Sequence, residues 1–154
     1  MVNIDEMSID QVRQQASEKH EPDGKPKVLA IDDEPGALQS ITVVLKDRCD
    51  VVTSTSKVEA LKRLHEIRPD VVITDLYSPD LSGFTFIESL KKLAPSIPVI
   101  VISGNIHPTV DMNGEKAKRA SQLGAVACMP KPFDVAELRR TVDRVLETRR
   151  GNAS

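Results

Sequence analysis

The stretch "VVITDLYSPDLSG", residues 71–83, joins a short apolar run to an aspartate and then to a turn. Residues 71–74 are apolar or β-branched, which is typical of a strand buried on both faces. Asp75 follows directly, and the Pro, Ser, Asp and Gly residues after it have the composition of a loop. A buried strand that ends on a carboxylate has two interpretations. Either Asp75 only terminates the strand, or the strand places Asp75 in a functional site.

The bulk composition is that of an ordinary folded domain. The chain has 154 residues, with 40% hydrophobic and 29% charged, which is enough to bury one core. A net charge of −2 gives no electrostatic reason to expect nucleic-acid or membrane binding. No apolar run approaches the ~18 residues of a membrane span, and the N-terminus has no secretory signal, so we expect a cytoplasmic protein. Cys49 and Cys128 lack metal-ligand spacing and are expected to be free thiols.

Three segments differ in composition. Residues 1–26 are expected to be an N-terminal extension, either flexible or folded as a short helix, because "SIDQ" at 8–11 has the form of a capping box. Residues 27–148 are expected to form the folded domain. Residues 149–154 are expected to be a C-terminal tail.

Apolar periodicity alternates between strand and helix along residues 27–148. Strands are predicted at 27–31, 51–54, 71–74, 98–103 and 125–129. Helices are predicted over 35–46, from Ser56 to Pro69 with Val58, Leu61, Leu64 and Ile67 on one face, from Phe84 to about Pro95, around Ala117 to Leu123, and after Asp134. Capping boxes are expected at Ser56–Glu59 and Asp134–Glu137.

The strands at 28–31, 71–74 and 99–102 are apolar on both faces. Such strands belong to a parallel sheet that is covered by helices on both sides. The pattern therefore predicts an α/β fold with a doubly wound, five-stranded parallel sheet. In such a fold, ligands bind at the carboxyl edge of the sheet.

Polar residues follow four of the predicted strands. Asp32 and Asp33 come after the first, Asp75 after the third, Ser103 after the fourth and Lys131 after the fifth. The carboxyl ends of parallel strands lie along one edge, so we expect these side chains to share a pocket. The second interpretation of Asp75 is therefore favoured.

The chemistry of this set follows from its charges. Three clustered carboxylates repel one another, and a hard divalent cation such as Mg²⁺ relieves that repulsion. Lys131 adds a fixed positive charge, and Ser103 adds a hydroxyl donor. A nucleophilic carboxylate, a cation, a lysine and a hydroxyl are what phosphoryl transfer onto an aspartate requires.

Four short motifs carry a resemblance to a known family: "IDDE", "TDLYSPDLSG", "ISG" and "KPF". Over about residues 27–148 the chain resembles the receiver domain of two-component response regulators, of the chemotaxis-regulator kind. The resemblance implies a flavodoxin-like fold with strand order 2-1-3-4-5.

The resemblance also implies roles for individual residues. Asp75 would be the phosphoacceptor, and Ser103 and Lys131 would contact the phosphoryl group. Mg²⁺ would be held by Asp33 directly, by Asp32 through water, by Asp75 and by the backbone carbonyl of Tyr77. A cis Lys131–Pro132 peptide bond is also implied.

The implied partners are those of a phosphorelay. The phosphoryl donor would be a phosphohistidine on a sensor histidine kinase or a histidine phosphotransfer protein. The downstream partner would be another protein, with no direct contact to nucleic acid or membrane.

Three features depart from the usual family pattern. Cys128 stands in the last predicted strand where family members usually carry Tyr or Phe. Ser78–Pro79 replaces the usual Met-Pro. The connection between Ser103 and Gly124 is about six residues longer than usual, and His107 in it is interpreted as a loop residue.

Three functions remain to be compared. The first is a phosphorylatable switch without its own output domain, either complete or cut from a longer regulator. The second is a receiver-like binding module that no longer depends on phosphorylation. The third is a Mg²⁺-dependent phosphatase, which is disfavoured because Tyr77 stands where those enzymes have a general-acid aspartate.

Overall fold

The computed structural model describes residues 24–104 and 114–152. The strands of this part are β1 (Lys27–Ile31), β2 (Asp50–Ser54), β3 (Val71–Thr74), β4 (Val99–Ser103) and β5 (Ala125–Pro130). The helices are α2 (Pro35–Leu45), α3 (Lys57–Lys62), α4 (Leu64–Ile67), α5 (Gly83–Leu93), α6 (Glu115–Leu123) and α7 (Val135–Asn152). Most of the N-terminal extension, and the part of the long connection that contains His107, lie outside the described residues.

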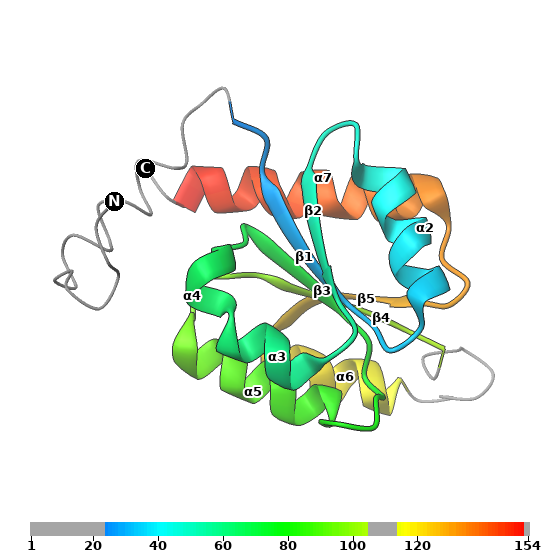
Figure 1. The fold of residues 1–154 in the computed structure, drawn as a ribbon, viewed down its shortest axis with the longest axis vertical. Coiled ribbons are helices and arrows are strands. Elements are labelled where there is room, and N and C mark those ends of the chain that lie inside the picture. The colour runs from blue at the N-terminus through cyan, green and yellow to red at the C-terminus, as the bar shows by residue number, and fades with distance from the viewer. Residues whose placement is uncertain (1–23, 105–113, 153–154) are drawn as a thin grey trace, which may run out of the picture.

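The strands form one parallel sheet in the order β2-β1-β3-β4-β5 (Figure 1). This arrangement confirms the predicted doubly wound, flavodoxin-like fold. The chain moves from β1 to β2 in one direction and from β3 onward in the other. The order therefore reverses between β1 and β3, whose carboxyl ends flank the usual ligand crevice of such folds.

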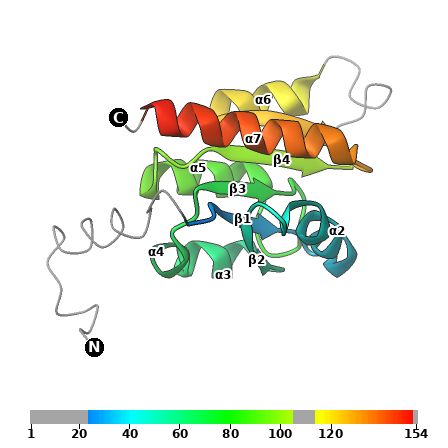
Figure 2. The same cartoon turned by 90° about the horizontal axis from the view of Figure 1, so that it is seen from above.

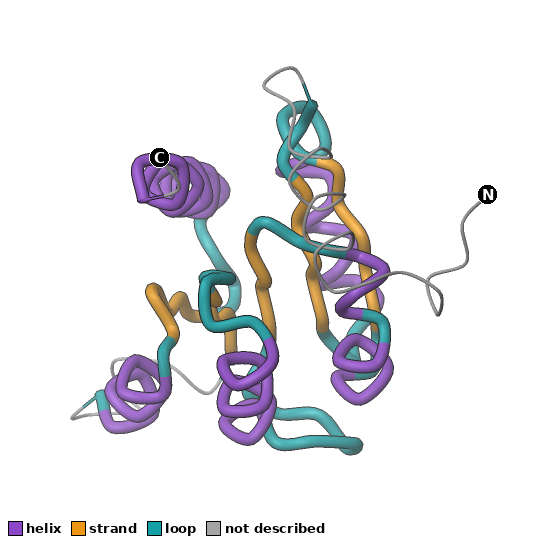
Figure 3. The backbone as a smooth tube through the Cα atoms, turned by 90° about the vertical axis from the view of Figure 1, so that its left-hand side faces the viewer, coloured by secondary structure: helices purple, strands orange, loops and turns teal. Residues whose placement is uncertain are grey.

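Helices cover both faces of the sheet (Figures 1 and 2). Helices α2 and α7 pack on one face, and α3, α4, α5 and α6 pack on the other. Figure 3 shows the strands lying side by side with helices on either side of them. Strands β1, β3 and β4 are buried almost throughout, because each contributes side chains to both layers.

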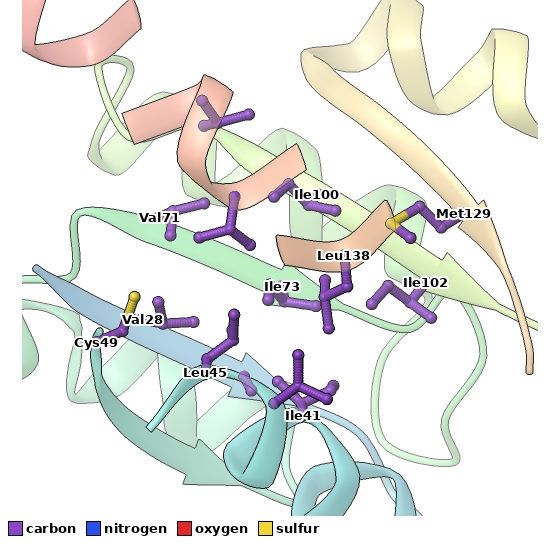
Figure 4. Close-up of a cluster of buried hydrophobic side chains, with 14 of the residues drawn as sticks. Val28, Ile41, Leu45, Cys49, Val71, Ile73, Ile100, Ile102, Met129 and Leu138 are labelled. Atoms are coloured by element: carbon purple, nitrogen blue, oxygen red, sulfur yellow. The ribbon is translucent and has the colours of Figure 1, made fainter. Parts of the chain in front are cut away.

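The core beneath α2 and α7 is formed by alternate residues of the strands (Figure 4). Val28, Val71, Ile73 and Ile100 point to this face, whereas their sequence neighbours point to the other. Cys49 lies in this core as a free, buried thiol, and Cys128 is a partly buried free thiol. Both thiols agree with the prediction.

The N-cap hydrogen bond of each predicted capping box forms. The hydroxyl of Ser56 accepts a hydrogen bond from the backbone N–H of Glu59 (3.1 Å), and the carboxylate of Asp134 accepts one from Glu137 (3.0 Å). Gly124 ends α6 with φ of 123°, which a residue with a side chain rarely adopts.

Two sequence predictions require correction. The helix predicted from Ser56 to Pro69 is interrupted at Arg63. The first half of its predicted buried stripe is displaced by one position, whereas Leu64 and Ile67 are buried as predicted. Val58 and Leu61 are only half-buried, while Lys57 and Ala60 are buried.

The predicted C-terminal tail is also partly wrong, because α7 continues to Asn152 and includes residues 149–152. Arg149 donates hydrogen bonds to the backbone carbonyls of Pro69 and Asp70, which holds the last turns against the sheet. In the described part of the chain, no helix has the length and apolarity needed to cross a bilayer.

Candidate functional site

The carboxyl edge of the sheet, on the right in Figure 1, brings three predicted acidic residues together. Ligand oxygens of Asp32, Asp33 and Asp75 all lie within 4.8 Å of one another. Asp32 and Asp33 follow β1 and Asp75 follows β3, so the acids stand at the point where strand order reverses. Asp32 and Asp75 are buried, and Asp33 is exposed. We call these three residues the acid cluster.

Lys131 reaches into the acid cluster from the end of β5. Its Nζ lies 2.6 Å from Oδ2 of Asp32 and 3.2 Å from Oδ2 of Asp75. The side chain is 19% exposed, so the bridge is largely screened from water. The Lys131–Pro132 peptide bond is cis, as the resemblance implied.

Charge and burial oppose each other in this bridge. Burial raises the pKa of Asp32, although hydrogen bonds from Lys131 and from the backbone N–H of Glu34 (2.9 Å) oppose the rise. For Lys131, burial favours the neutral amine, but the hydrogen bond to Asp32 and the charge of Asp75 raise its pKa above the ordinary value. Lys131 therefore stays charged at neutral pH.

Ser103 ends β4 and is fully buried. Its backbone carbonyl accepts a hydrogen bond from the N–H of Lys131 (3.2 Å), which ties the two predicted phosphoryl-contact residues to the same edge. Cys128, two residues before the end of β5, points toward α6, where its Sγ lies 3.8 Å from the carbonyl oxygen of Ala117.

The loop after Asp75 turns tightly against the start of α5. Gly83 donates its N–H to the carbonyl of Leu76 (2.7 Å), and the N–H of Tyr77 points at Oδ1 of Asp75 (3.3 Å). The loop borders an open hollow of about 480 Å³ beside Asp33. Tyr77 is 42% exposed beside this hollow, and Asp33 is the member of the acid cluster that lines it and is open to solvent.

Sequence reasoning missed a second group of polar residues next to the acid cluster. Lys57 has no exposed surface, and its Nζ lies 2.6 Å from Oγ of Ser78. Asp80 accepts hydrogen bonds from Ser78 (2.8 Å) and Ser56 (2.8 Å). Helical periodicity could have revealed Lys57. It stands three residues before Ala60 and seven before Leu64, so it falls on the same face of the helix as these buried residues.

Asp80 is expected to make stability depend on acid pH. Burial alone would raise the pKa of Asp80, but hydrogen bonds from the N–H of Val58 and the hydroxyls of Ser56 and Ser78 lower it from 3.8 to about 2. A carboxyl whose pKa falls on folding stabilises the folded state above its unfolded pKa, and this contribution disappears as the pH falls through the folded pKa.

We therefore expect Asp80→Asn to be less stable than wild type at pH 7, by no more than about 1 kcal/mol because Asp80 is exposed. The difference should shrink between pH values of about 4 and about 2. Urea denaturation of wild type and Asp80→Asn at several pH values between about 2 and about 7 measures this difference in stability. Asp47→Asn, which changes an exposed aspartate outside the network, is the control. A difference that stays constant with pH would contradict the assignment.

The donor set of the acid cluster suits a hard divalent cation. It offers oxygen atoms only, two from buried carboxylates and one from the exposed carboxylate of Asp33. Mg²⁺ prefers oxygen ligands and keeps several waters, which an opening toward solvent permits. The residues present therefore fit Mg²⁺.

Comparison with known proteins gives the same assignment. The family described as the response regulator receiver domain matches residues 28–143. A protein-glutamate methylesterase/protein-glutamine glutaminase of Cereibacter sphaeroides is 35% identical over 113 residues, which cover 71% of this chain and 30% of that protein. The two-component response regulator ORR22 of Oryza sativa is 37% identical over 130 residues, covering 82% of this chain and 18% of that protein. The chain thus spans less than a third of the length of these two relatives.

Solved structures agree in fold over nearly their whole length. A receiver domain protein from Clostridium thermocellum aligns with a TM-score of 0.72 and 32% identity, covering 81% of this chain and 97% of that one. The chemotaxis protein CheY4 of Vibrio cholerae aligns with a TM-score of 0.70 and 29% identity, covering 79% of this chain and 99% of that one. With the strand order and the acid cluster at the reversal point, these matches show that the chain belongs to the response regulator receiver domain family.

Proposed function

We propose that this receiver domain accepts a phosphoryl group from a phosphohistidine onto Asp75 and signals in its phosphorylated form. The observation that supports this most is the bridge from Lys131 to both Asp32 and Asp75, because it joins the acceptor carboxylate to a fixed cation inside an accessible acid cluster.

The reaction is a transfer between two nucleophiles. A carboxylate oxygen of Asp75 attacks the phosphorus of the donor, an oxygen–phosphorus bond forms, and the phosphorus–nitrogen bond to the donor imidazole breaks with its electron pair staying on nitrogen. Lys131 stabilises the negative charge on the phosphoryl oxygens, and the hydroxyl of Ser103 donates a hydrogen bond to one of them.

Mg²⁺ supplies charge neutralisation between the acceptor and the phosphoryl oxygens when it is bound. Asp33 and Asp75 would hold it directly, Asp32 through a water molecule, and the backbone carbonyl of Tyr77 would complete the protein ligands. Asp33 suits a metal ligand because its carboxylate is the exposed member of the cluster and borders the hollow.

The proposed partners follow from this chemistry. The donor is a sensor histidine kinase or a histidine phosphotransfer protein, which docks over the carboxyl edge of the sheet. The output is a protein contact or onward transfer of the phosphoryl group, and the domain acts chemically only on its own Asp75.

Phosphorylation by a small donor tests the proposal. We expect incubation with acetyl phosphate and Mg²⁺ to add the mass of one phosphoryl group to the wild type and none to Asp75→Asn, because an amide is a poor nucleophile. Intact-mass spectrometry measures both.

Phosphorylation-independent binding is the competing function, and the same measurement separates it. Unchanged mass in folded wild type would favour the binding module over the phosphoacceptor. Equal gain in wild type and Asp75→Asn would place the phosphoryl group on another residue.

A further inference from the structure

The most unusual side chain in the described part of the chain is Lys57, in the first turn of α3. A lysine with no exposed surface is rare in folded proteins unless opposite charges face it. The Nζ atom of Lys57 donates to Oγ of Ser78 at 2.6 Å. Ser78 is three residues after the proposed phosphoacceptor, so the buried ammonium group reaches the loop that borders the acid cluster.

A chain of hydrogen bonds extends from this contact. The hydroxyl of Ser78 donates to Oδ1 of Asp80 (2.8 Å). Oδ2 of Asp80 accepts from the hydroxyl of Ser56 (2.8 Å) and from the N–H of Val58 (3.1 Å). The start of α3 is thus joined to the loop after β3 by four side chains, and Lys57 is the positive member of this network.

The charge of Lys57 is balanced by carboxylates from two sides. Burial lowers the pKa of Lys57 below its ordinary value, although the charges of Asp75, Asp80, Asp33 and Asp32 oppose the fall, Asp75 most strongly. All three members of the acid cluster therefore act on this ammonium group through their charge, while its hydrogen bond goes to Ser78.

The second lysine changes the net charge of the acceptor site. The three acids and Asp80 carry four negative charges, and Lys131 and Lys57 carry two positive charges. The remaining charge of −2 would be neutralised by one divalent cation. Without Lys57, the same site would carry −3 and would attract a cation more strongly.

We propose that Lys57 is a second internal cation of the acceptor site, which shares the acid cluster with Mg²⁺ and weakens Mg²⁺ binding. The inference rests on the proposed Mg²⁺ site of the preceding section. It assigns Lys57 an electrostatic role that differs from that of Lys131, because Lys57 approaches from the loop side and contacts neither Asp32 nor Asp75.

A purely mechanical role predicts the opposite result. If Lys57 only positioned the loop, its removal would displace the carbonyl of Tyr77 and weaken Mg²⁺ binding. Removal of the Ser78 hydroxyl would then do the same. The electrostatic role requires that loss of the charge strengthen binding and that loss of the hydroxyl alone have little effect.

Magnesium titration of the purified protein distinguishes these roles. Tyr77 is the single tyrosine and the chain has no tryptophan, so tyrosine fluorescence reports from the loop beside the acid cluster. MgCl₂ is titrated at constant ionic strength into wild type, Lys57→Met, Lys57→Gln and Ser78→Ala. Methionine keeps the unbranched shape and most of the length of the lysine side chain without its charge, and glutamine, also uncharged, provides a hydrogen-bond donor.

We expect both Lys57 variants to bind Mg²⁺ at least about fivefold more tightly than wild type, because removing a nearby positive charge removes its repulsion of a divalent cation, even where solvent and salt screen most of that repulsion. Ser78→Ala should stay within about twofold of wild type. The matched control is Lys62→Met, a 68% exposed lysine of the same helix, which should also stay within about twofold because solvent screens it.

Equal or weaker binding in both Lys57 variants, with native circular dichroism, would overturn the inference. Titration of Asp33→Ala tests the metal site separately, because this variant should lose the binding seen in wild type. If wild type binds no Mg²⁺ but the Lys57 variants do, the inference stands and the proposed wild-type metal site fails. If none of them binds, both fail.

Discussion

Replacing Gly83 by alanine is expected to lower the free energy of unfolding by about 3 kcal/mol, the upper range for an overpacked core site. A Cβ atom on Gly83 would lie 2.4 Å from Cα of Leu76, 2.7 Å from the carbonyl oxygen of Leu76 and 2.8 Å from that of Asp75. These are all backbone atoms, so the loop itself must move. Because this loop carries the acceptor, the variant should also be phosphorylated more slowly at temperatures where it remains folded.

Gly36 provides the matched control. It lies in α2, and a Cβ atom built there meets nothing within 4 Å. Gly36→Ala should therefore be neutral or stabilising by up to about 1 kcal/mol, since alanine is favoured over glycine in helices. Urea denaturation measures both variants, and a Gly83→Ala protein as stable as Gly36→Ala would contradict the close approach of the loop to α5.

Replacing Lys131 by methionine is expected to slow phosphorylation by acetyl phosphate by about 100-fold or more, the typical effect of removing one group that stabilises developing charge. Lys131 contacts both Asp32 and Asp75 from a largely buried position. Its loss leaves the acceptor carboxylate without a fixed cation when the phosphoryl oxygens arrive. It also leaves two buried acids without their shared partner, so Mg²⁺ should bind more tightly even as the reaction slows.

The time course of intact mass at fixed acetyl phosphate and Mg²⁺ measures this rate. Lys92→Met, on the exposed face of α5, is the control and should match wild type. A Lys131→Met rate within about fivefold of wild type would show that the charge of Lys131 is not needed for transfer, whatever its effect on metal affinity.

The sheet was predictable because the apolar pattern of its strands matches their burial in the structure. β1, β3 and β4 are apolar on both faces, and such strands fit only a parallel sheet between two helix layers. The helix after Ser56 was predicted less well. The second half of its buried stripe, Leu64 and Ile67, was predicted correctly. The first half was assigned to Val58 and Leu61, but the inward positions belong to Lys57 and Ala60, and periodicity counts lysine as polar.

The acid cluster was predictable because a parallel sheet brings the carboxyl ends of its strands to one edge. Asp32, Asp33 and Asp75 follow strands whose carboxyl ends flank the reversal of strand order. The network of Lys57, Ser78 and Asp80 was not, because it depends on how the loop after β3 packs on the start of α3. Contacts between a loop and a helix more than twenty residues away follow from tertiary packing, which no local pattern encodes.

Chemical trapping of the acyl phosphate tests the central claim most directly, which is that Asp75 is the phosphoacceptor. Borohydride reduces an aspartyl phosphate to homoserine, and peptide mass spectrometry locates the changed residue. After treatment with acetyl phosphate and Mg²⁺, we expect homoserine in place of Asp75 and unchanged aspartate at every other aspartate position. Homoserine in place of Asp32, Asp33 or Asp80 would contradict this claim. So would unreduced aspartate at position 75 in a protein that has gained a phosphoryl group.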